Sequence, residues 1–299
     1  DLIDNNYVQH CCVMLTSFFE NNKEEGNVIH LLTEGITEDN KKTIEELIHA
    51  YKGEFCYYLV NSEIVASFPI KEGDHLTIAT YYRLLMADIL PQSIDKILYL
   101  DCDIIINDSI TELWNTSLDG YAMAAIEELG CSLPDVYKRL GYDKKYGYFN
   151  AGVLLINLQY WREHNLTREF LLYIAENYEK LKAHDQDVLN ALLHKKCLHV
   201  SYKWNVEEAF YHYSVMKRLK HNRELRFVLR HPTILHYTWK PKPWDLSCKH
   251  PFRINYYIYL QRFAGSSLNF KRKLAALFDK YVFCFFLWIN LKGHRYYKL

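Results

Sequence analysis

Apolar and polar positions alternate along this chain with two different periods. Helical spacing, with apolar side chains at every third or fourth position, predicts helices over residues 7–21, 40–51, 77–90, 166–181 and 185–193. Short runs rich in β-branched and aromatic residues predict strands over residues 28–32, 55–60, 96–100, 122–126, 152–158 and 233–236. We expect Asn40 to cap the second helix and Pro91 to end the third. Strands that alternate with helices indicate an α/β fold with a mostly parallel sheet.

Composition narrows the function classes. The chain has 299 residues and 49% apolar content, enough for one substantial core. Lys plus Arg and Asp plus Glu both total 36, and this balance argues against nucleic acid as a partner. The eight Cys residues include no Cys-x-x-Cys pair, which disfavours a zinc ribbon. Several lie in apolar stretches, and with no signal-like N-terminus we expect a cytoplasmic protein.

The end of the chain differs in composition from the rest. We expect one domain over residues 1–250 and a helical tail over residues 251–299. From Lys271 onward, the sequence contains seven Lys and Arg residues but only one acidic residue, Asp279. Asp279 and Lys280 interrupt the apolar run, so it is too short for a transmembrane helix of about 20 residues. A basic, aromatic segment suits the anionic cytoplasmic face of an inner membrane, and packing against the domain is the alternative.

Two carboxylates follow the strand predicted at residues 96–100. Asp101 and Asp103 are two positions apart, where the chain leaves the sheet, and ligands of open α/β sheets bind beyond such strand ends. Two carboxylates placed in this way can hold a hard cation such as Mg²⁺ or Mn²⁺ on a diphosphate. Asp-x-Asp is also common in turns and helix caps, so the triplet alone does not decide between these interpretations.

Four further segments accompany the triplet Asp101-Cys102-Asp103. They are Ile3-Asp4-Asn5-Asn6-Tyr7, Phe149-Asn150-Ala151-Gly152-Val153-Leu154-Leu155-Ile156-Asn157, His184-Asp185-Gln186-Asp187-Val188-Leu189-Asn190 and His236-Tyr237-Thr238-Trp239-Lys240-Pro241-Lys242-Pro243-Trp244. In this order the five segments resemble the retaining glycosyltransferases of family 8, which include bacterial lipooligosaccharide glycosyltransferases and glycogenin. The resemblance covers roughly residues 1–250. It implies a GT-A fold, a Rossmann-like nucleotide-sugar-binding α/β domain with a mixed central sheet.

The resemblance also implies a metal and a phosphate contact. Mn²⁺, with Mg²⁺ as the alternative, would be held by Asp101, Asp103 and His236. Lys242 matches the lysine that reaches the donor phosphates, as a compact point charge. Without the resemblance, His236 would be interpreted as a buried histidine at a strand end and Lys242 as a solvated loop lysine.

Further positions match residues that surround the donor in this family. Asp4, Asn6 and Tyr7 would bind the uracil and ribose, although a polar turn that caps a helix is also plausible there. Asp185 and Gln186 are expected beneath the donor sugar, as the catalytic pair. The remaining donor-binding positions are Arg83, Cys102, Asn150, Ala151 and Gly152.

Four other positions carry a weaker match or a departure. His75 is similar to a family histidine at the edge of the substrate site, and a helix N-terminal role is equally plausible. Asn5 replaces a frequent Asp. Glu127, with Glu128 as the alternative, stands where the family often has Asp, and Trp239 stands where many members have Gly.

The activity implied is transfer of glucose or galactose from a UDP-sugar, with retention, to a hydroxyl of a glycan or glycolipid such as lipopolysaccharide. The amide oxygen of Gln186 is a poor nucleophile, which favours a front-face reaction. A catalytically silent relative that binds only a nucleotide sugar is one alternative. A nucleotidyltransferase is another, but it does not account for the segments at residues 184–190 and 236–244.

Overall fold

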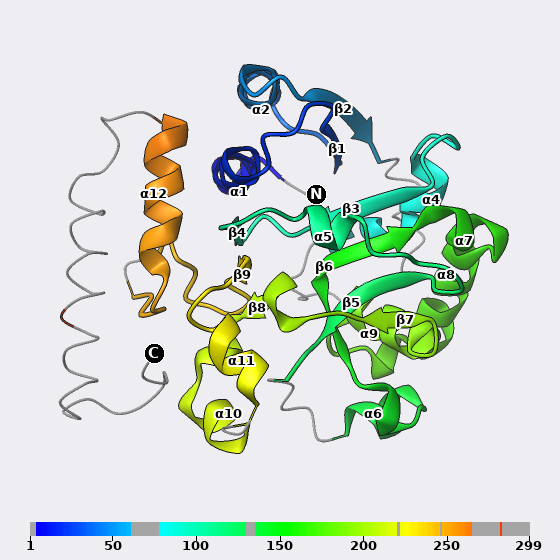
Figure 1. The fold of residues 1–299 in the computed structure, drawn as a ribbon. Coiled ribbons are helices and arrows are strands. Elements are labelled where there is room, and N and C mark those ends of the chain that lie inside the picture. Colours follow the sequence, from blue (N-terminus) through cyan, green and yellow to red (C-terminus); the bar gives the residue numbers. More distant parts are fainter. Residues whose placement is uncertain are drawn as a thin grey trace.

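A four-stranded sheet forms the centre of the protein, seen here in a computed structural model that describes residues 4–60, 78–129, 135–219, 222–245, 247–264 and 282 (Figure 1). Its spatial order is β3 (Lys96–Leu100), β6 (Phe149–Asn157), β5 (Met123–Glu127) and β7 (Cys197–His199). β6 runs antiparallel to β3 and β5, and β7 runs parallel to β5. The sheet is therefore mixed, with β3, β5 and β7 sharing one direction, and the predicted α/β fold is confirmed.

Two smaller sheets flank the central one. β1 (Val28–Thr33) pairs in parallel with β2 (Glu54–Leu59). β9 (Ile234–His236) lies between β4 (Ile104–Ile106), to which it is antiparallel, and β8 (Val206–Glu207), to which it is parallel. Since β4 begins four residues after β3 ends, the chain passes directly from the central sheet into the β4-β9-β8 sheet. This passage is the Asp101–Asp103 segment.

Helices cover both faces of the central sheet. α4, α7, α8 and α9 contribute to the core cluster on one face, and α1 and α2 contribute to the cluster on the other (Figure 1). Leu154 and Ile156 of β6 belong to the first cluster and Val153 to the second, as the alternation of a strand buried on both faces requires. The helices are α1 (Val8–Asn21), α2 (Glu38–Ala50), α4 (Met86–Ile89), α5 (Thr111–Trp114), α6 (Val136–Leu140), α7 (Leu158–Glu163), α8 (Leu166–Asn177), α9 (His184–Leu193), α10 (Tyr213–Arg218), α11 (Arg223–Val228) and α12 (Arg253–Ala264). Short 3₁₀ segments are η1 (Ile78–Leu85), η2 (Lys144–Tyr146), η3 (Tyr178–Lys180), η4 (Tyr202–Trp204) and η5 (Glu208–Tyr211).

Some predicted elements differ from the observed ones in type or boundary. The helix predicted over residues 77–90 is instead η1 followed by one α-helical turn. All five side chains from Tyr81 to Leu85 are buried, so this segment has no polar face of the kind an amphipathic α-helix shows. Thr37, not Asn40, caps α2, because its side chain accepts the Asn40 backbone N–H. β6 begins three residues earlier than predicted.

The end of the described chain packs on its beginning. α12 lies beside α1, and its residues Ile254, Tyr257 and Leu260 are buried in a shared core (Figure 1). This packing extends the globular part past residue 250, to about Ala264, so we place the proposed start of the tail after that residue. Residues 265–281 and 283–299, which carry the basic and aromatic tail, lie outside the described residues. Among the described helices, none is long and apolar enough to cross a bilayer.

Candidate active site

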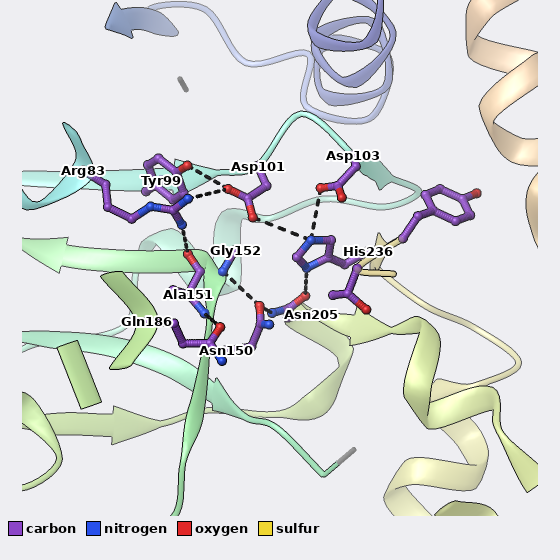
Figure 2. A network of polar contacts seen from close by, with 12 residues as sticks. Arg83, Tyr99, Asp101, Asp103, Asn150, Ala151, Gly152, Gln186, Asn205 and His236 are labelled. Atoms are coloured by element: carbon purple, nitrogen blue, oxygen red, sulfur yellow. Dashed lines mark hydrogen bonds and ion pairs between the residues drawn. The ribbon is translucent and has the colours of Figure 1, made fainter. Parts of the chain in front are cut away.

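Asp101, Asp103 and His236 converge at the junction between the central sheet and the β4-β9-β8 sheet (Figure 2). The Asp101 backbone N–H donates to the Gly152 carbonyl (2.9 Å), and the Asp103 carbonyl accepts from the Tyr237 N–H (3.0 Å). Each carboxylate is thus held by the strand beside it. His236 Nε2 lies 3.1 Å from Asp103 Oδ1 and 3.7 Å from Asp101 Oδ2. One ligand atom from each of the three side chains lies within 4.8 Å of the other two.

Gly152 has no side chain, and the side chains of Asp101 and His236 occupy the space beside it. A Cβ atom at Gly152 would lie 2.1 Å from His236 Cε1 and 2.7 Å from Asp101 Oδ2. Both distances are far below van der Waals contact, so the position excludes a side chain. The β6 backbone at Gly152 lies close to both Asp101 and His236. This close approach explains why the strand carries a glycine at this position.

Lys242 extends the cluster on the side of Asp103. Its ammonium pairs with the Asp103 carboxylate and donates to the carbonyls of Tyr237 (2.6 Å) and Thr238 (3.1 Å). Burial alone would lower the pKa of Lys242, but the charge and hydrogen bond of Asp103, together with Tyr7 and Asp101, outweigh it and the pKa is raised. Burial would likewise raise the pKa of Asp103, but Lys242 and His236 hold it below its usual range. Both groups are therefore charged at neutral pH.

Arg83 forms ion pairs with both Asp101 and Asp185, on the side of the cluster opposite Lys242. Its guanidinium donates to the Ala151 carbonyl (2.7 Å) and forms ion pairs with Asp185 Oδ2 (2.9 Å) and Asp101 Oδ1 (3.3 Å). The ring of Tyr99 lies against it, 4.4 Å from ring centre to Cζ, and the Tyr99 hydroxyl donates to Asp101 Oδ1 (2.7 Å). Burial raises the pKa of Asp185 to about 6, against the opposing effect of Arg83. One buried cation thus orients a carboxylate in each half of the site.

Gln186 is held by both ends of its amide. Gln186 Oε1 accepts the Ala151 N–H (2.9 Å), and Nε2 donates to Glu128 Oε2 (2.7 Å). Glu128 is partly buried, and this burial raises the pKa of its carboxyl. Glu127, the residue first expected at this position, instead contacts Gly147 and Tyr202. The contact with Gln186 favours Glu128, the alternative, and the match of either glutamate to the family position stays a prediction.

The turn at Asp4–Tyr7 approaches the site from α1. Asp4 Oδ1 accepts the backbone N–H groups of Asn6 (2.8 Å) and Tyr7 (3.1 Å), in the turn just before α1. Burial and the charge of Asp103 raise the pKa of Tyr7, while Lys242 opposes them, so its hydroxyl lies within electrostatic reach of the cluster. Tyr7 thus lies on the side of Lys242, and Asp4 and Asn6 precede it in the same turn.

The remaining expected positions are placed as follows. The Cys102 thiol is hydrogen-bonded to that of Cys11 in α1, so its side chain points away from the carboxylates. Asn150 is buried beside Gly152 and donates to Glu128. His75 lies outside the described residues. The sequence analysis missed Tyr99 and Asn205, since neither carries a recognisable motif.

Comparison with known proteins agrees with this geometry. A family model described as glycosyl transferase family 8 matches residues 2–248. General stress protein A of Bacillus subtilis is 29% identical over 267 residues, covering 86% of this chain and 90% of that protein. A lipopolysaccharide 1,2-glucosyltransferase of Escherichia coli is 28% identical, over 81% of this chain and 71% of its own. The crystal structure of galactosyltransferase LgtC with donor and acceptor sugar analogues superposes with a TM-score of 0.78 at 26% identity, covering 91% of this chain and 98% of the other.

The match to the family model spans most of the chain, and the solved structure shares its fold over nearly the whole length of both proteins. Asp101, Asp103 and His236, which the family motifs single out, also meet at one place, where the central sheet ends. This chain is a glycosyltransferase and belongs to glycosyl transferase family 8.

Proposed function

We propose that this enzyme transfers glucose or galactose from a UDP-sugar, with retention of configuration and with Mn²⁺, to a hydroxyl of a glycan acceptor. The observation that carries the proposal is the convergence of Asp101, Asp103 and His236 between a lysine on one side and the Arg83–Asp185 pair on the other. Such a site would place metal ligands, a contact for the donor phosphates and a sugar pocket side by side.

The donor set fits a divalent metal of the manganese type. Asp101 and Asp103 supply hard oxygen ligands, and His236 supplies one imidazole nitrogen, a combination that suits Mn²⁺ better than Ca²⁺. Mg²⁺ is the alternative. When bound, the metal would supply Lewis-acid neutralisation of the charge on the leaving diphosphate. Gly152 keeps the space beside these ligands free of a side chain.

Two groups of side chains would bind different parts of the donor, one the UDP part and the other the hexose. Lys242 would meet the diphosphate as a point charge, and Tyr7 would lie beside the uracil. Asp185 and Asn150 would accept and donate hydrogen bonds to hydroxyls of the hexose. The backbone at Gly152 would allow the sugar to approach closely.

The contacts of Gln186 favour a front-face reaction over a covalent intermediate. Its amide oxygen already accepts the Ala151 N–H, and an amide is a poor nucleophile. In the proposed step the acceptor oxygen bonds to the anomeric carbon on the face that UDP leaves. The bond between that carbon and the phosphate oxygen breaks, UDP departs with the electron pair, and the acceptor proton passes to the departing phosphate.

The acceptor is proposed from the relatives and from the tail. Two relatives are named as lipopolysaccharide glucosyl- and galactosyltransferases. We propose that the acceptor here is a lipopolysaccharide or another cell-surface glycan, reached at the cytoplasmic face of the inner membrane. The basic, aromatic segment after residue 270 would hold the enzyme on that anionic surface.

A donor screen tests the proposal. UDP release is measured with a panel of UDP-sugars and Mn²⁺, with chelator and with metal added back. We expect turnover of UDP-glucose or UDP-galactose that chelator abolishes and Mn²⁺ restores, and an α-linked product by NMR. Asp103→Asn should abolish turnover, whereas Asp108→Asn, at an exposed turn, should not. Neither binding nor turnover of any UDP-sugar would overturn the proposal, and binding without turnover would mark a silent relative.

A further inference from the structure

Asn205 lies behind His236 and is fully buried (Figure 2). It follows the turn η4 directly and precedes β8, and its backbone N–H donates to the Tyr202 carbonyl (3.2 Å). Its amide sits between two side chains from distant parts of the sequence. Asn205 Oδ1 is 2.9 Å from His236 Nδ1, and Nδ2 is 2.8 Å from Asn150 Oδ1. No family motif quoted above includes this residue.

The direction of this hydrogen-bond chain is set at its far end. The Gly152 backbone N–H can only donate, and it donates to Asn150 Oδ1 (2.9 Å). The other end of the Asn150 amide faces the carboxylate of Glu128, which accepts from it. Both neighbours therefore require the Asn150 oxygen to point toward Gly152 and Asn205.

The orientation of the Asn150 amide fixes the orientation of the Asn205 amide, which in turn fixes the nitrogen of His236 that carries a hydrogen. Because Asn150 presents an oxygen, Asn205 must present its NH₂ group to it. Asn205 therefore turns its own oxygen to His236 Nδ1, and that nitrogen must carry a hydrogen. The free lone pair of the neutral ring is then on Nε2, the atom that lies 3.1 Å from Asp103 Oδ1.

We propose that Asn205 is a positioning residue that fixes the ring and tautomer of His236, so that Nε2 points its lone pair at the metal. The inference rests on the proposed function for the metal itself. Outer hydrogen-bond partners of metal-bound histidines orient the ring in this way, and their loss typically weakens metal binding by about 10- to 100-fold. The chain from Gly152 to His236 also ties the metal ligand to the β6 backbone that borders the sugar pocket.

A double-mutant cycle separates this role from a structural one. Mn²⁺ binding to the metal-free protein is measured by the EPR signal of free Mn²⁺, without any sugar donor. The variants are Asn205→Leu, His236→Gln and the double variant, with Asn205→Ala where Leu does not fold. We expect Asn205→Leu to weaken binding by about 10- to 100-fold in the wild-type background. In the His236→Gln background it should add almost nothing, because the ring it positions is gone.

Two further variants sharpen the result. Asn205→Asp keeps an acceptor for His236 Nδ1, so it should bind Mn²⁺ more tightly than Asn205→Leu even if it lowers stability as much. Asn22→Leu removes another buried Asn, one that joins α1 to the backbone of Ile110, and should leave Mn²⁺ affinity unchanged.

Equal losses in both backgrounds, equal affinities of Asn205→Asp and Asn205→Leu, or no loss at all would overturn the assignment. Failure of the proposed function looks different. Mn²⁺ binding that depends on His236 and Asn205 without hexose transfer would refute the transferase and leave this assignment standing. Additive losses of Mn²⁺ affinity in an enzyme that does transfer hexose would refute the role of Asn205 and leave the proposed function standing.

Discussion

Gly152→Ala tests the packing of the metal-ligand cluster with a single methyl group. The added Cβ would lie 2.1 Å from His236 Cε1, about 1.4 Å short of a normal carbon–carbon contact of about 3.5 Å. His236 has little room to move, because it is 3% exposed, is bound at Nδ1 by Asn205 and sits on a strand paired on both edges. Either the ring or the β6 backbone must shift.

The expected magnitudes follow from that shift. Overpacking of a filled site typically costs about 1–3 kcal/mol of unfolding free energy. Metal–ligand distances tolerate only about 0.2 Å, so a displacement on the order of an ångström removes His236 from the coordination set. We therefore expect Mn²⁺ affinity to fall by at least about 10-fold, a loss in the range seen when outer partners of metal ligands are removed.

The assay pairs urea unfolding with Mn²⁺ titration of the same variant. Gly141→Ala is the matched control. Gly141 ends α6 with φ 77°, and a Cβ there would meet nothing within 4 Å. Alanine in the left-handed region should cost about 1–2 kcal/mol without touching the site. The reasoning is refuted if Gly152→Ala binds Mn²⁺ as the wild type does, or if Gly141→Ala loses affinity to the same degree.

Three further changes test Arg83, Trp239 and the C-terminal tail one at a time. Arg83→Met should cost about 3–5 kcal/mol in urea unfolding and abolish turnover, because it leaves Asp185 buried without its cation; a cost under 1 kcal/mol would contradict this. Trp239→Ala, at a side chain 55% exposed, should leave stability unchanged and raise the acceptor KM roughly tenfold, as loss of about 1.4 kcal/mol of binding would. A matching rise in the Kd for UDP would count against an acceptor role for Trp239. Deletion of residues 265–299 should abolish sedimentation with anionic liposomes, and retained sedimentation would exclude the tail as the membrane contact.

The pattern of apolar and polar residues predicted Asp101 and Asp103 as a candidate metal-binding pair because they follow a strand, and the family resemblance added His236. Asp101 follows a run that is plainly a strand, and His236 ends another. Nothing in the pattern said that these two strand ends meet, since β3 and β9 belong to different sheets. The family resemblance supplied that link, and the short passage from β3 to β4 provides its physical reason.

The choice between Glu127 and Glu128 depends on a local feature of the sheet. Neighbouring residues of a strand face opposite sides, so an offset of one residue exchanges the two glutamates. The pairing of β5 with β6 contains an irregularity of odd length, because β5 advances by two residues and β6 by five between the pairs Ala124–Leu155 and Ile126–Asn150. Bulges of this kind leave no reliable signal in the spacing of apolar residues. Glu127 and Glu128 therefore could not be distinguished before the pairing of β5 was known.

Asn205 was beyond prediction for a different reason. Its role depends on three segments that are far apart in the sequence, at Asn150, Asn205 and His236, and on the orientation of each amide between them. Asn150 links the two regions, because one end of its amide contacts Glu128 in the proposed sugar pocket and the other contacts Asn205, which leads to the candidate metal ligand His236. In the proposed donor complex, a hexose that draws Asn150 toward its hydroxyls would act on the same hydrogen-bond chain that reaches His236. The proposed sugar and metal sites would then be coupled through one side chain, so Asn150→Ala should weaken Mn²⁺ binding even without a sugar present.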